Sequence, residues 1–194
     1  MPHARATGTS ANRATDRVAS PATITREMTP RPAFTVGYEG SDLPALLGVL
    51  TAAGVTTVVD TRRTPTSRRP AFRREALRRA LEDAGLSYVS RPALGMPKAL
   101  RPLAKRPDRR WLFDLAYRGV LARAVDEVDE TVRLGESGRI ALLCFEIDPG
   151  TCHRELLARA MAARGPFLFD HLRPGDREDA DDHPVTELVV RPHD

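Results

Sequence analysis

Short apolar runs alternate with segments of helical periodicity along this chain, from about residue 33 onward. The runs are rich in β-branched residues and too short for typical helices, so they predict strands. Strands are predicted at residues 33–40, 55–63, 86–91, 139–146, 167–172 and 186–191. Apolar residues spaced three and four positions apart predict helices at 41–54, 73–85, 111–138 and 152–164, the third being one long helix or a broken pair.

Residues typical of helix ends support these boundaries. In the first predicted helix, Ser41 or Asp42 can cap the first turn, and Pro44 suits a position within it. Gly54 is placed to end that helix. The segment 92–110 is basic and interrupted by prolines, which predicts a loop or lid, with a short helical turn as an option.

Strands that alternate with helices favour one α/β domain, in which a mostly parallel sheet is flanked by helices on both faces. We assign this domain to residues 33–194. Residues 1–32 have no periodic apolar face and predict a disordered N-terminal tail. The same segment also has the Arg-rich, acid-poor composition of a transit peptide, and Met28 is an alternative start of translation.

The composition of the chain limits the kinds of partner and the cell compartment that we expect for this protein. No apolar run approaches the roughly 20 residues of a membrane helix, so a membrane partner is not expected. The chain has 194 residues and only two cysteines, which argues against a disulfide framework and favours a reducing cytoplasm. Its net charge of +4 suits an anionic partner. Nearly all of the basic residues are arginine, a residue suited to phosphate recognition, although a compositional bias of the genome would give the same excess.

Chemically active side chains follow the predicted strands where each strand ends. In an open parallel sheet, ligands bind outside the carboxyl ends of the strands, so these residues should converge on one rim. The rim candidates are Tyr38, Glu39, Asp60, Arg62, Cys144 and Glu146. Ser67, in the loop after the second strand, is a further candidate for substrate binding.

The stretch from Asp148 to Arg154 leads from this rim into the last predicted helix. Asp148 or Thr151 can cap that helix, which would place Cys152 in or near its first turn. Free backbone N–H groups and the helix dipole favour an anion there and lower the pKa of a thiol. The guanidinium of Arg154 can bind phosphate or carboxylate through two parallel N–H groups, and His153 can transfer protons near neutral pH. The sequence therefore predicts an anion-binding site.

Each candidate also has a structural interpretation. Cys144 lies in an apolar run and can be a small buried hydrophobe, whereas Asp60 and Arg62 can form a plain ion pair. Several known motifs are absent, among them the tyrosine-phosphatase loop, the Walker A loop and the dinucleotide-binding fingerprint. The side chains of Cys144, Cys152, His153 and the distant His171 include zinc ligands, but their spacing matches no standard motif. No metal site is therefore predicted, and the cofactor is unknown.

Several blocks of sequence together resemble the family called domain of unknown function 488. These are "TVGYEG", the stretch from "VVDTRRTPTSRRPAF" to "RPALG", and "LLCFEIDPGTCHRELLA" followed by "DHL", which span roughly residues 34–172. The resemblance implies a compact α/β domain, but no reaction. The positions it implies as important are Gly37, Tyr38, Glu39, Gly40, Asp60, Arg62, Pro65, Ser67, Phe72, Leu94, Gly95, Cys144, Glu146, Asp148, Cys152, His153 and Arg154. Met96 stands where the family usually has a second glycine, and the segment 97–110 is shortened and unusually basic.

We expect a cytoplasmic enzyme or enzyme-like domain that acts on a small phosphorylated or nucleotide-like molecule. In this hypothesis Arg62 and Arg154 hold the anion, and Cys152 or His153 supplies nucleophilic or acid–base chemistry. Asp60 and Glu146 orient them. The first alternative is a nucleic-acid-binding module that uses the arginine-rich loops, and the second is a purely structural partner domain.

Overall fold

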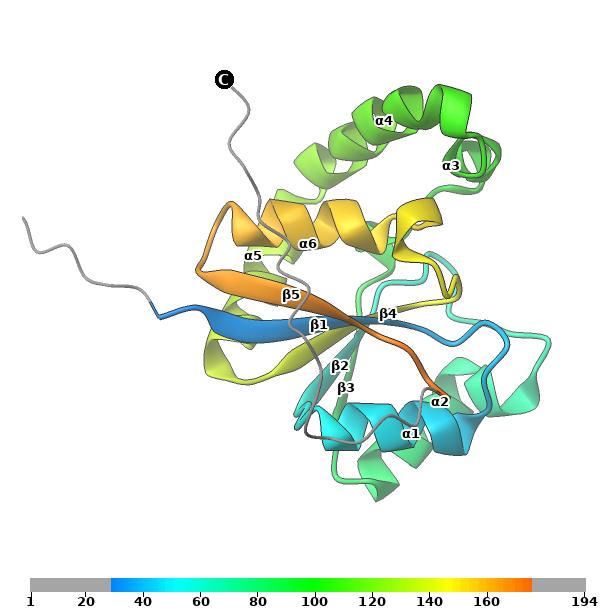
Figure 1. Ribbon diagram of the computed structural model, residues 1–194, viewed down its shortest axis with the longest axis vertical. Coiled ribbons are helices and arrows are strands. Elements are labelled where there is room, and N and C mark those ends of the chain that lie inside the picture. The colour runs from blue at the N-terminus through cyan, green and yellow to red at the C-terminus, as the bar shows by residue number, and fades with distance from the viewer. Residues whose placement is uncertain (1–28, 176–194) are drawn as a thin grey trace, which may run out of the picture.

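The computed structural model describes residues 29–175, which form a five-stranded parallel sheet between two layers of helices (Figure 1). The spatial order of the strands is β3-β2-β4-β1-β5. Their bounds are β1 Arg31–Gly37, β2 Thr57–Asp60, β3 Ser87–Ser90, β4 Ile140–Cys144 and β5 Phe167–Leu172. All pairings are parallel, as the alternation of apolar runs and helical segments predicted.

Six α-helices connect and cover the strands. Their bounds are α1 Leu43–Ala52, α2 Arg74–Asp83, α3 Arg101–Ala104, α4 Arg110–Arg123, α5 Val125–Ser137 and α6 Arg154–Ala162. Figure 1 shows α1 and α2 on one face of the sheet and α4, α5 and α6 on the other. The predicted arrangement, with helices on both faces, is confirmed.

Local sequence explains where the first and longest helical segments begin and break. Asp42, rather than Ser41, caps α1, because its Oδ1 accepts a hydrogen bond of 2.8 Å from the N–H of Ala45. The segment predicted as one helix or a pair is a pair, which breaks at Ala124 (φ −119°, ψ 33°). The basic segment 92–110 contains α3 and several 3₁₀ turns, and α4 begins at its last residue, Arg110.

The strands separate two hydrophobic cores, because successive side chains of a strand point to opposite faces. Val58 and Leu143 face the core that α1 and α2 cover, where Leu46 and Leu77 are fully buried. Val59, Ile140 and Leu142 face the opposite core, which includes Phe113 and Tyr117 of α4, Val128 of α5 and Leu157 of α6. A sheet buried on both faces explains why β4 reads as an unbroken apolar run.

The first strand begins earlier than the sequence analysis predicted. β1 begins at Arg31, whose N–H donates to the carbonyl of Pro166, so Arg31 and Pro32 belong to the sheet rather than to the tail. The rest of the predicted tail, the segment 1–28, lies outside the described residues. The strand predicted at 186–191 lies outside them as well.

Candidate functional site

The carboxyl ends of β1, β2 and β4 meet at one rim of the sheet, as the parallel topology requires. In the register of the sheet, Gly37 lies beside Cys144, and Asp60 lies beside Leu143. The backbone continues this alignment past the strands, because the N–H of Glu39 donates to the carbonyl of Phe145 at 2.9 Å. Residues far apart in sequence therefore share one small region.

A pocket of about 760 Å³ opens at this rim. The basic side chains that line it are Arg62, Arg63, Arg68, Arg69, Arg101 and Lys105. The predicted site residues that line it are Tyr38, Arg62, Ser67, Cys144, Glu146 and His153. Five other predicted site residues do not line it: Glu39, Asp60, Asp148, Cys152 and Arg154.

Asp60 and Arg62 form a buried ion pair at the end of β2. Arg62 donates from Nε to Asp60 Oδ1 at 2.8 Å and from Nη2 to Oδ2 at 2.6 Å, and both side chains are at most 5% exposed. Its Nη1 donates to the Tyr38 hydroxyl and to the carbonyl of Phe72, each at 2.8 Å. Tyr88 donates to Asp60 Oδ2 at 2.6 Å. Described residues thus engage four of the five N–H groups of Arg62 and hold the guanidinium in one orientation.

The ion pair also shifts the protonation of its neighbours. Burial alone would lower the pKa of Arg62, but the hydrogen bond and charge of Asp60 outweigh it and raise that pKa above its ordinary value. Burial and the negative charge of Asp60 raise the pKa of the Tyr88 hydroxyl. Arg62 therefore stays cationic and Tyr88 stays protonated at any physiological pH.

Four polar groups gather just below the pocket, between β4 and the start of α6. The Cys144 thiol donates to Glu146 Oε2 at 2.8 Å, and the Cys152 thiol donates to the same oxygen at 3.4 Å. The Nδ1 atom of His153 lies 3.7 Å from the sulfur of Cys144 and 3.6 Å from that of Cys152. The ligating atoms of all four residues lie within 4.8 Å of one another, a grouping that could hold a metal ion. The cysteines are free thiols.

Burial and mutual contacts shift the pKa values of all four groups. A hydrogen bond with Cys152 and burial raise the pKa of Cys144, and burial also raises the pKa of Glu146. Burial alone would raise the pKa of Cys152, but the hydrogen bond with Cys144 and the charge of His153 lower it below the ordinary thiol value. Burial alone would lower the pKa of His153, but the charge of Cys152 raises it. Cys152 therefore loses its proton before Cys144 does.

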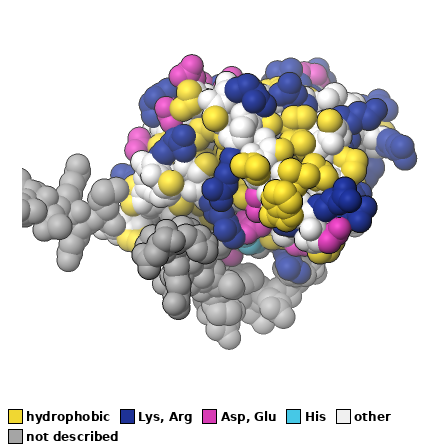
Figure 2. All heavy atoms as spheres, turned by 90° about the horizontal axis from the view of Figure 1, so that it is seen from above, with side chains coloured by type: hydrophobic (Ala, Val, Ile, Leu, Met, Phe, Trp, Pro, Cys, Tyr) yellow, Lys and Arg dark blue, Asp and Glu magenta, His cyan; other side chains and the backbone are white. Residues whose placement is uncertain are grey.

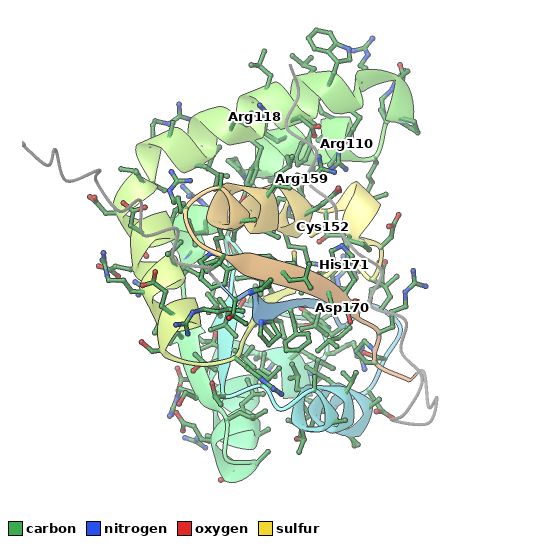
Figure 3. The ribbon with its side chains drawn as sticks, turned by 60° about the vertical axis from the view of Figure 1, so that its left-hand side comes forward. Arg110, Arg118, Cys152, Arg159, Asp170 and His171 are labelled. Atoms are coloured by element: carbon green, nitrogen blue, oxygen red, sulfur yellow. The ribbon has the colours of Figure 1, made fainter. Side chains whose placement is uncertain are left out.

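The start of α6 differs from the expectation. Asp148 caps a 3₁₀ turn at Pro149–Thr151 by accepting from the N–H of Gly150, and α6 begins only at Arg154. Cys152 is extended (φ −114°, ψ 156°) and lies before the helix rather than in its first turn. Figure 3 shows Cys152 at the amino end of α6 and His171 apart from it, on β5. Burial alone would raise the pKa of this thiol, and contacts with Cys144 and His153, rather than a place in the first helical turn, lower it.

Arg154 faces the protein interior. It is 1% exposed and donates to the carbonyls of Glu146 and Ile147 and, at 3.2 Å, to the hydroxyl of Thr35. Its side chain therefore fixes the loop that carries Glu146. Glu39 supports the same loop, because its Oε2 accepts from the N–H of Ile147 at 3.3 Å.

Two contributors were missed in the sequence analysis. Thr61 accepts at its carbonyl from His153 Nε2, 3.3 Å away, and Phe145 lines the pocket with 43% of its surface exposed. Thr61 lies between Asp60 and Arg62, and Phe145 lies between Cys144 and Glu146, so a search that included every residue near the end of each predicted strand would have found both. Ser67 accepts from the N–H of Arg69 at 3.2 Å and so shapes the pocket loop.

The family comparison agrees with the resemblance drawn from the sequence blocks. A family model described as domain of unknown function DUF488 matches residues 42–161. No curated protein and no solved structure matches the chain. Among residues 29–175, no helix has the length and apolar character needed to cross a membrane.

Proposed function

The chain belongs to the family described as domain of unknown function DUF488, and from that premise we propose that it binds a small phosphorylated or nucleotide-like molecule in the rim pocket. The observation that carries this proposal is the charge of the pocket lining. Six Lys and Arg side chains line the pocket, whereas Glu146 is the one carboxylate among the lining residues. Such a concave cationic surface attracts anions and concentrates them.

The basic side chains that line the pocket come from two segments that are separate in the sequence. Arg68 and Arg69 belong to the loop after β2, whereas Arg101 and Lys105 belong to α3 and the residue after it. Arg68, Arg101 and Lys105 are exposed, so their flexible side chains can close on a phosphate from both walls. Arg62, already oriented by Asp60, has one further N–H for the ligand.

An apolar part of the lining suits a base or another flat group. Phe145 lies edge-on to Tyr38, with ring centroids 5.5 Å apart, and Tyr38 stacks on Phe72 at 4.3 Å. Phe145 is partly exposed, so a ligand can reach its ring. Stacking on Phe72 holds the ring of Tyr38 in place. A volume of about 760 Å³ lies within the usual range for small-molecule sites.

The groups placed to act on such a ligand are Cys144, Glu146 and His153, which line the same pocket. They could supply nucleophilic or acid–base chemistry to a phosphate held by the arginines. Cys152 would act through them, because it does not line the pocket.

The nucleic-acid alternative has less support from the surface. Figure 2, which looks onto the side of α3 and α4, shows Lys and Arg side chains spread around hydrophobic ones rather than joined in one stripe. The large exposed hydrophobic residues of α4 are Trp111 and Leu115. A dedicated binder of duplex backbones needs a continuous basic track. A basic pocket of limited volume favours a small anion.

The test is a titration of the full chain with AMP, ADP, pyrophosphate and inorganic phosphate. Binding is measured by calorimetry and by the rise in melting temperature. The pocket variant is Arg68→Gln/Arg101→Gln, and the matched control is Arg118→Gln/Arg133→Gln, which removes equal charge from exposed positions on α4 and α5. We expect at least one phosphorylated compound to raise the melting temperature. We expect its affinity to fall about tenfold or more in the pocket variant only, because each charge-assisted contact contributes about 1.5–3 kcal/mol.

Equal weakening in both double variants would contradict the proposal, because the binding would then follow net charge alone. The absence of binding by any small compound, together with salt-sensitive binding of an oligonucleotide, would favour the nucleic-acid alternative.

A further inference from the structure

We propose that Cys144, Glu146, Cys152 and His153 form a zinc site at the floor of the pocket. The observation is geometric: four side chains that are all common zinc ligands bring their ligating atoms within 4.8 Å of one another. The inference goes beyond the proposed function and does not rest on it, because it concerns a metal ion and not the anionic ligand.

Three of the distances between the ligating atoms match those of a tetrahedron around a single ion. With zinc–sulfur bonds of about 2.3 Å and zinc–nitrogen or zinc–oxygen bonds of about 2.0 Å, neighbouring ligand atoms lie roughly 3.3–3.8 Å apart. The two distances from His153 Nδ1 to sulfur are 3.7 and 3.6 Å, and Cys152 Sγ lies 3.4 Å from Glu146 Oε2. The distance from Cys144 Sγ to that oxygen, 2.8 Å, is shorter, and a small rotation of the Glu146 carboxylate would lengthen it.

The second nitrogen of His153 has the partner that a zinc-bound histidine needs. Its Nε2 lies 3.3 Å from the carbonyl of Thr61, which can only accept a hydrogen bond, so Nε2 carries the proton. The lone pair of Nδ1 then points toward the two sulfurs. A hydrogen bond from the outer nitrogen to a carbonyl is the usual way in which proteins fix the ring of a metal-binding histidine. Thr61 is itself held, because its hydroxyl donates to the carbonyl of Leu143 at 2.9 Å.

The surrounding structure holds the four ligands in place before any ion binds. Cys144 is the last residue of β4, a fully buried central strand. Arg154 fixes the loop after β4 by donating to the carbonyls of Glu146 and Ile147. Tyr117 of α4 packs its ring edge-on against His153, at 5.3 Å between centroids. A preorganised site of this kind loses little entropy when it binds a metal.

The ligand set also favours zinc over other abundant cations. Thiolate and imidazole ligands select zinc, whereas magnesium and calcium require oxygen ligands. The bound ion would lie beside the pocket, because Cys144, Glu146 and His153 also line it. It would occupy the donor atoms of these side chains, so in the zinc-bound protein the ion would replace them as the group that meets a bound anion. Glu146 is the least buried of the four, so it is the ligand closest to solvent.

The test is the zinc content of the full chain, purified without chelators and measured by inductively coupled plasma mass spectrometry. We expect about one zinc ion per chain in the wild type and a loss of most of it in Cys144→Ser and Cys152→Ser. The matched control is His171→Gln, which removes a histidine that lies outside the group and should keep its zinc.

A second measurement covers the case in which the cysteine variants fail to fold. Wild-type protein stripped by a chelator should bind one equivalent of Co²⁺ and develop both thiolate-to-cobalt charge-transfer bands and the visible bands of a tetrahedral complex. Zinc should remove these bands. Wild-type protein without zinc that also gives no tetrahedral cobalt spectrum would overturn the proposal, as would a disulfide between Cys144 and Cys152 in that metal-free protein. Both results leave the titration with phosphorylated compounds unaffected, so the two proposals fail separately.

Discussion

The buried ion pair of Asp60 and Arg62 gives the sharpest prediction about stability. Asp60→Ala removes the carboxylate that accepts two side-chain hydrogen bonds from Arg62 and one from the Tyr88 hydroxyl. The guanidinium would remain in a site where it is only 5% exposed. Its cationic form would then lack a partner of opposite charge.

The size of the effect follows from these contacts. Loss of one partner of a buried, hydrogen-bonded ion pair costs about 3–5 kcal/mol, because the remaining charge stays desolvated. We therefore expect Asp60→Ala to lower the free energy of unfolding by about 4 kcal/mol. Arg62→Met should cost less, because its aliphatic chain can pack in the same space and the carboxylate keeps Tyr88 as a donor. The double variant should be more stable than the sum of the single effects predicts, by roughly 2 kcal/mol.

The assay is urea unfolding of the four proteins in a double-mutant cycle. Glu82→Ala is the control, because it removes an ion pair with Arg78 whose side chains are 46% and 36% exposed, and we expect it to change stability little. A cost below about 1 kcal/mol for Asp60→Ala, together with additive effects, would refute the idea that this pair is effectively desolvated.

Two further predictions concern the loop after β4 and a histidine on β5. Gly37→Ala should destabilise the protein by about 1–3 kcal/mol, because a Cβ there would collide with the carbonyl of Glu146. Gly48→Ala on α1, where a Cβ meets nothing within 4 Å, should stabilise the protein by about 0.5–1 kcal/mol. Both variants are measured by urea unfolding, and equal changes in the free energy of unfolding would contradict the packing argument. Burial and the charge of Arg154 lower the pKa of His171, so its folded form resists protonation and stability should fall between about pH 7 and pH 5. In His171→Gln this fall should be smaller, and parallel curves of stability against pH would contradict the assignment.

Much of the architecture followed from local patterns. The short apolar runs predicted all five described strands, and their alternation with helical segments predicted parallel pairing and two helical layers. Because parallel strands end at one edge, the same pattern also predicted that Tyr38, Arg62 and Cys144 lie near one another, and all three line the pocket. The physical basis is that the period of burial and the residues at helix ends are local properties of the chain.

Only the tertiary structure decided where individual side chains point. Arg154 has the chemistry of an anion ligand, yet it turns inward to bind backbone carbonyls. Glu146 rather than His171 joins the two cysteines and His153. These outcomes depend on the path of the loop after β4 and on contacts between His153 and Thr61, which are 92 positions apart. The sequence by itself determined the strands, the layers and the rim, because burial periodicity is local. The fold determined that Cys144, Glu146, Cys152 and His153 come together, because packing between distant segments selects the rotamers of these side chains.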